Sequence, residues 1–316
     1  EVLYGYPIDG VILTTGCDKT TPAALMAAAT VNIPSIVLSG GPMLDGSYKG
    51  KKAGSGTIIW EARRLHAKGE INYEEFMDMA AASAPSIGHC NTMGTASSMN
   101  SIAEALGMSL TGGAIIPAPY KERETISYKT GKRIVEMVHE DLTPSKIMTK
   151  QAFENAIYVA SAIGASSNCP PHLEAIARHM GIDFGIDNWQ KLGHDIPLLV
   201  NCQPAGEHLM EGFFKAGGIP AVMQELMKNN KLHKNLITVT GKTIEENLKE
   251  KITIDKNVIK TFKEPLVKNA GFIVMKSNFF NSAVMKTSVI SPEFRKRYLS
   301  NPKNPNIFEA NAIVFE

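Results

Sequence analysis

Two short apolar runs flank an alanine-rich segment near the start of the chain, and this order constrains the fold more than any other feature. The runs "DGVILTTG" (9–16) and "PSIVLSGGPM" (34–43) predict buried strands, and "TPAALMAAATVN" (21–32) predicts a helix with a proline in its first turn. A strand, a helix and a strand within about 35 residues predict a βαβ unit with parallel strands. Ligands of such units bind beyond the carboxyl ends of the strands, so we expect a site at the turn after the first strand.

Alternating helix-like and strand-like segments continue to about residue 265 and predict an α/β fold. From about residue 270, "GFIVMKSNFF", "SAVMKTSVIS" and "NAIVFE" predict strands, with no helix between the first two. We therefore expect a parallel-sheet α/β domain over 1–267 and the beginning of a β-rich domain over 268–316. The chain opens on Glu1 and ends inside a strand-like run, so we expect a piece of a longer protein, incomplete at both ends.

The composition favours a small-molecule ligand. Lys and Arg (33) nearly balance Asp and Glu (31), and no basic stripe with interleaved aromatic residues is present, which argues against a nucleic-acid partner. No run of about 18 apolar residues predicts a membrane span, and no basic-then-apolar leader opens the chain. The four cysteines are far apart and show no CxxC spacing, which argues against a zinc ribbon or a disulfide framework. We expect a cytoplasmic protein.

The turn after the first predicted strand carries Cys17, Asp18 and Lys19 in direct succession. A thiolate is a soft ligand that suits iron or an iron–sulfur cluster, whereas a carboxylate is a hard ligand that suits magnesium. Adjacent residues at a turn can face different ways, so one loop could serve two metals. The alternative is that Cys17 is a small buried apolar residue and Asp18 a helix cap.

A second glycine-rich turn, "GHCNTMGT" (88–95), also precedes a predicted helix. The start of that helix could offer backbone N–H groups to an anion such as a substrate carboxylate. Cys90 lies beside His89 and Asn91, so a thiol nucleophile is a second interpretation, and a packed cysteine is a third.

The remaining motifs carry weaker signals. We expect structural roles for Cys169 and Cys202, because neither lies beside a carboxylate or a lysine. "TGKT" (240–243) resembles only the tail of a phosphate-binding loop. Six histidines show no HExxH spacing, and we expect them on the surface or satisfied in the core: His66, His172, His179, His194, His208 and His233.

Several stretches together resemble the dihydroxy-acid dehydratase / phosphogluconate dehydratase family over nearly the whole chain. "GHCNTMGT" is similar to the sugar-acid branch of this family, which includes the arabinonate and xylonate dehydratases, and other stretches are nearest to the L-arabinonate group. The resemblance rests on "GCDKTTPAALMAA", "IVLSGGPMLDG", "GHCNTMGTASSMNSIAEALGMSL", "IPAPYKERETISYKTG", "KQAFENAI", "GASSNCPPHLEAIARH" and "VNCQPAGEH".

This resemblance implies a [2Fe–2S], Mg²⁺-dependent hydro-lyase that converts L-arabinonate or a related pentonate to its 2-keto-3-deoxy acid. It assigns Cys17 and Cys90 as cluster ligands, and Asp18 and a carbamylated Lys19 as magnesium ligands. It also implies a C-terminal β-barrel domain and a homodimer or homotetramer. Within the chain, Lys19 and His89 are the candidate catalytic residues.

By the same resemblance, the third cluster cysteine and another magnesium carboxylate precede the chain, and the serine base follows it. We therefore expect the 316 residues alone to lack turnover. Three alternatives stay open: a dihydroxy-acid dehydratase of branched-chain amino-acid synthesis, a non-catalytic relative that has lost its metals, and a cysteine-nucleophile enzyme using Cys90 with His89.

Overall fold

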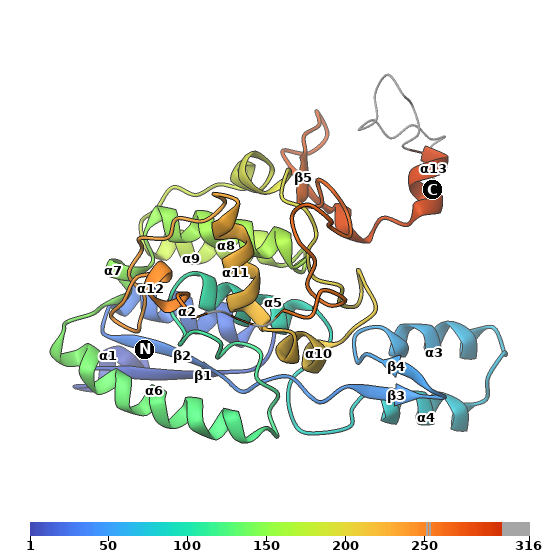
Figure 1. Cartoon of the computed structure of the whole chain (residues 1–316), viewed down its shortest axis with the longest axis horizontal. Helices are drawn as coiled ribbons and strands as arrows, with labels where there is room; N and C mark the ends of the chain where they lie inside the picture. The colour runs from blue at the N-terminus through green and yellow to red at the C-terminus, as the bar shows by residue number, and fades with distance from the viewer. Residues whose placement is uncertain (251, 253, 299–316) are drawn as a thin grey trace.

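The computed structural model describes residues 1–250, 252 and 254–298 (Figure 1). Strands β1 (Val11–Thr15) and β2 (Ser35–Ser39) pair in parallel and in register from Val11↔Ser35 to Thr15↔Ser39. Helix α2 (Thr20–Val31) connects them and ends where Asn32 takes a left-handed conformation, with φ of 55°. The predicted βαβ unit is confirmed, and the turn that carries Cys17 lies at the carboxyl end of β1.

Helices cover both sides of this strand pair. Helix α6 (Lys121–His139) contacts both strands and runs along their lower side in Figure 1, while α2 and α5 (Thr95–Ala105) lie above them. Every residue of α5 from Ala96 to Ala105 is buried, because small side chains let α2, α8 (Lys150–Ala162), α9 (Cys169–His179) and α11 (Gly218–Lys228) pack closely around it. The predicted α/β fold is therefore confirmed, although its parallel sheet has only two strands in the described part of the chain.

Residues 46–82 form a small lobe beside this core, on the right of Figure 1. An antiparallel hairpin of β3 (Gly46–Tyr48) and β4 (Lys51–Ala53) packs on α3 (Ile58–Ala67) and α4 (Tyr73–Ala82), around a separate apolar cluster that includes Ala62 and Met79. The charged helical region expected near 57–83 is therefore two helices. The N-cap of the second helix is Asn72, whose side chain accepts from Glu75 N in a capping box.

The predicted strands near residue 270 are confirmed as the antiparallel hairpin β5 (Phe272–Met275) and β6 (Ala283–Lys286). Phe272 packs edge-on against Trp189, with ring centroids 5.0 Å apart, so the hairpin joins the main apolar core. The expected strand "NAIVFE" lies outside the described residues, and no closed barrel is formed within the described part. The barrel and the boundary at 267/268 stay predictions. The strand-like "IPLLVN" makes only isolated bridges, such as Leu198↔Val267.

The remaining elements are short connectors: α1 (Val2–Gly5), α7 (Pro144–Ile147), a π-helix (Trp189–Gly193), α10 (Met210–Lys215), α12 (Ile244–Asn247), a 3-10 helix (Thr287–Val289) and α13 (Pro292–Tyr298). Among the described residues, no helix combines the length and the apolar character that crossing a membrane requires.

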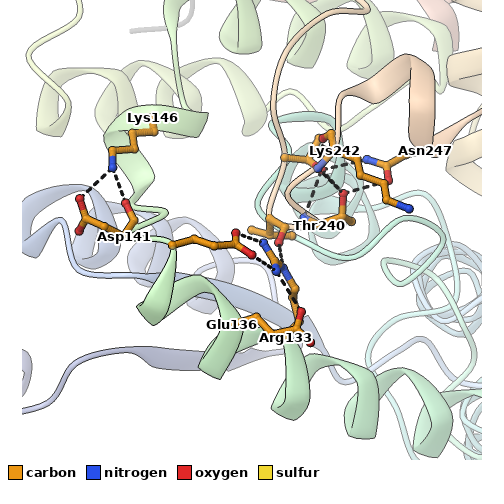
Figure 2. Close-up of polar contacts among 10 residues, drawn as sticks. Arg133, Glu136, Asp141, Lys146, Thr240, Lys242 and Asn247 are labelled. Atoms are coloured by element: carbon orange, nitrogen blue, oxygen red, sulfur yellow. Dashed lines mark hydrogen bonds and ion pairs between the residues drawn. The ribbon is translucent and has the colours of Figure 1, made fainter.

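Arg133 fastens the "TGKT" turn to α6, as Figure 2 shows. Its Nε donates to Val239 O over 2.5 Å, and its Nη1 donates to Glu140 and Glu136 over 2.7 and 3.0 Å. Gly241 has φ of 75°, and a Cβ there would lie 2.8 Å from Arg133 Nη2. The close approach of Arg133 therefore gives this glycine a packing explanation that needs no phosphate.

Candidate active site

The loop at the end of β1 is held by the hydroxyl of Thr20, the first residue of α2. Thr20 Oγ1 donates to Cys17 O over 2.9 Å and accepts from Cys17 N over 3.0 Å. The Cys17 thiol is exposed and lies 3.6 Å from Asp18 Oδ1. The N-cap of α2 is Lys19, so Asp18 is not the cap. Both structural alternatives for this loop, a buried cysteine and a capping aspartate, are therefore wrong.

The "GHCNTMGT" loop is anchored by Asn91, which is fully buried. Its Oδ1 accepts from Ser55 N over 2.9 Å, and its Nδ2 donates to Leu44 O over 2.8 Å. Gly88 has φ of 130°, and a Cβ at this position would lie 2.5 Å from Met43 N. These constraints place the Cys90 thiol at the surface, so a packed Cys90 is also wrong.

A buried hydrogen-bond chain joins the two cysteine loops. Thr15 and Thr21, from either end of the first loop, donate to Asn100 Oδ1 over 3.2 and 2.9 Å. Asn100 Nδ2 donates to His89 Nε2 over 3.1 Å, and His89 Nδ1 donates to Cys90 O over 3.0 Å. Cys17 and Cys90 are 73 positions apart in sequence, yet their loops share one polar core.

His89 is a neutral imidazole in this chain of hydrogen bonds. Burial, helped by the nearby Arg123 charge, lowers its pKa to about 4, although the hydrogen bond to Cys90 O opposes this shift. Both ring nitrogens have partners, so neither is left to activate the Cys90 thiol. This geometry favours a positioning role for His89 over the catalytic role expected, which stays a prediction.

The start of α9 is the third part of the site, and sequence reasoning missed it. Lys19 Nζ lies 3.2 Å from Nε2 of His172, a half-buried residue in the first turn of α9. Burial lowers the His172 pKa and the Lys19 charge lowers it further, while Asp18 opposes the shift. The motif "NCPPH", where two prolines open a helix, indicates that His172 lies in a first helical turn, but it does not indicate the contact with Lys19.

Hydrogen bonds join the first turns of α2, α5 and α9. Thr95 Oγ1, at the first residue of α5, lies 2.8 Å from Ser166 Oγ and accepts from Asn168 Nδ2 over 3.0 Å, just before α9. With the Lys19–His172 contact, which joins the starts of α2 and α9, three helix starts therefore lie together. Unpaired N–H groups and helix dipoles at such starts favour anions, including thiolates and carboxylates.

The other two cysteines are buried. Burial raises the pKa of Cys169 to about 12 and holds that of Cys202 well above its ordinary value. The expected structural roles of Cys169 and Cys202 fit these surroundings, because an inert buried thiol is neither a nucleophile nor an accessible ligand.

The donors that face solvent suit two kinds of metal. Cys17 and Cys90 offer soft sulfur, and Asp18 offers hard oxygen. Within residues 1–250, 252 and 254–298, no three His, Cys, Asp or Glu side chains gather as a complete metal site. Cys17, Cys90 and Asp18 therefore fit as part of a metal-ligand set and do not form a complete one.

A cleft of about 440 Å³ lies elsewhere, between the small lobe and Gln203, Pro204 and Gly206. Neither the two exposed cysteines nor Asp18 lines this cleft.

The chain is similar to known dehydratases. The family described as dihydroxy-acid/6-phosphogluconate dehydratase N-terminal matches residues 1–247. D-xylonate dehydratase from Caulobacter vibrioides is 60% identical over 316 residues, covering 100% of this chain and 53% of that protein. L-arabinonate dehydratase from Rhizobium leguminosarum bv. trifolii is 44% identical over 317 residues, with 100% and 53% covered. Dihydroxy-acid dehydratase from Acetivibrio thermocellus is 40% identical over 289 residues, with 91% and 52% covered. The chain spans about half the length of the curated relatives that it matches.

Proposed function

Because the chain belongs to the dihydroxy-acid/6-phosphogluconate dehydratase N-terminal family, we propose that the protein is a hydro-lyase that dehydrates a sugar acid to its 2-keto-3-deoxy acid. The observation that carries the proposal is the exposure of Cys17 and Cys90 on two loops joined through Asn100 and His89. A chain that needed these thiols only for packing would bury them, as it buries Cys169 and Cys202.

We propose a pentonate as substrate, with D-xylonate first among the candidates. The D-xylonate dehydratase is 60% identical to the chain, compared with 44% for the L-arabinonate dehydratase, and both matches cover the whole chain. This difference favours D-xylonate over the L-arabinonate expected from the motifs. Epimeric acids differ only in the orientation of a hydroxyl. Sequence identity therefore orders the candidate substrates but does not determine which one the protein uses.

We propose that Cys17 and Cys90 hold a [2Fe–2S] cluster and that Asp18 and a carbamylated Lys19 hold Mg²⁺. When bound, an open iron position and Mg²⁺ supply Lewis-acid chemistry for loss of a C3 hydroxyl and a C2 proton. The expected homodimer or homotetramer and the cytoplasmic setting remain parts of the proposal.

The residues of the chain have separable tasks in this proposal. The clustered starts of α2, α5 and α9 favour the negative charge of thiolates and of a substrate carboxylate. His89 and Asn100 orient the Cys90 backbone, and Thr20 orients that of Cys17. His172 lies against Lys19 and is placed to orient its amine.

The proposal is tested by anaerobic reconstitution of the intact protein with iron, sulfide and Mg²⁺. We expect an iron–sulfur absorbance spectrum that Cys17→Ser and Cys90→Ser abolish and that the buried-thiol control Cys202→Ala retains. Assays on D-xylonate, L-arabinonate and 2,3-dihydroxyisovalerate should yield a 2-keto-3-deoxy product from a pentonate. Turnover of 2,3-dihydroxyisovalerate alone would replace the sugar-acid assignment by branched-chain amino-acid synthesis. Reconstituted protein with no cluster would contradict the proposal.

A further inference from the structure

His172 lies at the start of α9 and is within hydrogen-bond distance of the Lys19 amine. Among the described residues, no other side chain of α9 hydrogen-bonds this amine. Nε2 of His172 lies 3.2 Å from Lys19 Nζ, across 153 positions of sequence. We propose that His172 is a positioning residue, which holds the Lys19 side chain in the orientation that carbamylation and metal binding require. The inference rests on the proposed role of Lys19 as a magnesium ligand.

Lys19 needs such a partner because its own surroundings constrain it little. Its side chain is exposed, at the N-cap of α2, and among the described residues its amine makes no hydrogen bond or ion pair other than the contact with His172. A free lysine side chain samples many rotamers, and fixing it in one orientation costs conformational entropy. A hydrogen bond from a residue that is itself fixed in a packed helix reduces this cost at the moment when the metal binds.

Histidine suits this task because one nitrogen can serve both forms of the lysine. The charged Lys19 amine first loses a proton to solvent. Carbamylation then joins the neutral Lys19 nitrogen to the carbon of CO₂ and releases a second proton, which leaves an anionic carbamate. Nε2 accepts from an amine N–H in one tautomer and donates to a carbamate oxygen in the other. The same contact can therefore persist before and after the reaction.

A second histidine of α9 provides a matched control. His179, at the end of the helix, places Nδ1 2.5 Å from Thr30 Oγ1 near the end of α2. Both histidines therefore join α9 to α2, but only His172 does so at the site. A residue that merely ties the helices together would behave like His179.

The experiment uses the intact protein with ¹³C-bicarbonate and with Mn²⁺ as a magnesium probe. The ¹³C carbamate signal reports on Lys19, and electron paramagnetic resonance reports the Mn²⁺ affinity. We expect His172→Leu to weaken both by about tenfold, the size of one hydrogen bond involving a charged group. His172→Gln, which keeps a donor and an acceptor at similar reach, should restore most of the loss, and His179→Leu should leave both unchanged.

Equal effects of His172→Leu and His179→Leu would overturn the inference, as would a His172→Leu variant with wild-type carbamate and Mn²⁺ binding. Wild-type protein that assembles its cluster on Cys17 and Cys90 but shows no carbamate at Lys19 would overturn this inference and leave the dehydratase proposal standing. Wild-type protein that binds neither cluster nor Mn²⁺ would overturn both.

Discussion

Asn100 donates a hydrogen bond from Nδ2 to Nε2 of His89, over 3.1 Å, in the buried layer between the two cysteine loops. Because an amide nitrogen can only donate, this contact requires His89 to accept through Nε2 and to donate through Nδ1 to Cys90 O. The Oδ1 of the same asparagine accepts from Thr15 and Thr21. One amide therefore sets both the tautomer of His89 and the spacing of the loops.

We expect Asn100→Leu to destabilise the protein by about 2–4 kcal/mol, because it leaves a ring nitrogen and two hydroxyls buried without partners. Urea unfolding measures this loss. We also expect the variant to assemble less iron–sulfur cluster, because the Cys90 backbone loses its fixed orientation.

Asn155→Leu is the control for this prediction. Asn155 is also fully buried and bridges backbone groups of His233, far in sequence from the cysteine loops. The two variants should lose comparable stability, but only Asn100→Leu should reduce cluster content. Equal cluster content in the two variants would show that Asn100 has no particular link to the thiols.

Thiol alkylation should separate the four cysteines into two classes. In the native, metal-free protein we expect iodoacetamide to modify Cys17 and Cys90, which are exposed. Burial raises the pKa of Cys169 to about 12 and also that of Cys202, so both should react only after unfolding. Mass spectrometry of digested samples gives the modified sites. Rapid native labelling of Cys169 would contradict the packing described for the start of α9.

Arg133 and Lys146 should differ sharply in their contributions to stability, although both make ion pairs from or near α6 (Figure 2). The Arg133 side chain is 10% exposed and also donates to Val239 O, whereas that of Lys146 is 49% exposed. We expect Arg133→Leu to cost about 2–4 kcal/mol, because Glu136, Glu140 and a carbonyl lose a shared donor. Lys146→Leu should cost less than about 1 kcal/mol.

Thermal or urea unfolding at low and high salt checks this comparison. The Lys146–Asp141 pair should weaken further as salt rises, since it is open to solvent. The loss at Arg133 should change little with salt, because much of it comes from buried hydrogen bonds. If the stability lost in Arg133→Leu depended on salt, the ion pairs with Glu136 and Glu140 would contribute more than the hydrogen bond to Val239 O.

The sequence correctly predicted those elements whose structure is determined by residues close to one another in the chain. The βαβ unit follows from apolar runs of strand length on either side of an alanine-rich helix, and the hairpin of β5 and β6 follows from two runs with no helix between them. Cys17 was identified at the turn between a predicted strand and a predicted helix, and Cys90 in a glycine-rich turn before another predicted helix. The exposure of the two thiols was not predicted, because it depends on the tertiary contacts that each loop makes.

Long-range polar contacts could not be predicted in the same way. His172 meets Lys19 across 153 positions, and Asn100 meets Thr15 across 85. An asparagine or a histidine within a helix has no local signature that distinguishes a bridging residue from one on the surface, because the partner is chosen by tertiary packing. Such contacts are found only once the helices are placed.

Glu104 should make the stability of the protein depend on pH. Its side chain is buried in α5, and the carboxylate accepts from Gly112 N and Ala114 N, over 2.7 and 2.9 Å. Burial raises its pKa to about 7, against the opposing effects of the two amides and of Arg123. An unfolded glutamate titrates near about 4.3, so between these values the folded protein holds more protons than the unfolded chain.

Stability from this group is therefore fully present below the unfolded pKa and is lost as pH rises through about 7. The loss is on the order of 3 kcal/mol for a shift of this size. Urea unfolding from pH 5 to pH 8 should show it, and Glu104→Gln should flatten the slope. The variant should also be less stable at pH 5, because its NH₂ group faces one of the two backbone donors. A slope that persists unchanged in Glu104→Gln would assign the pH dependence to another group.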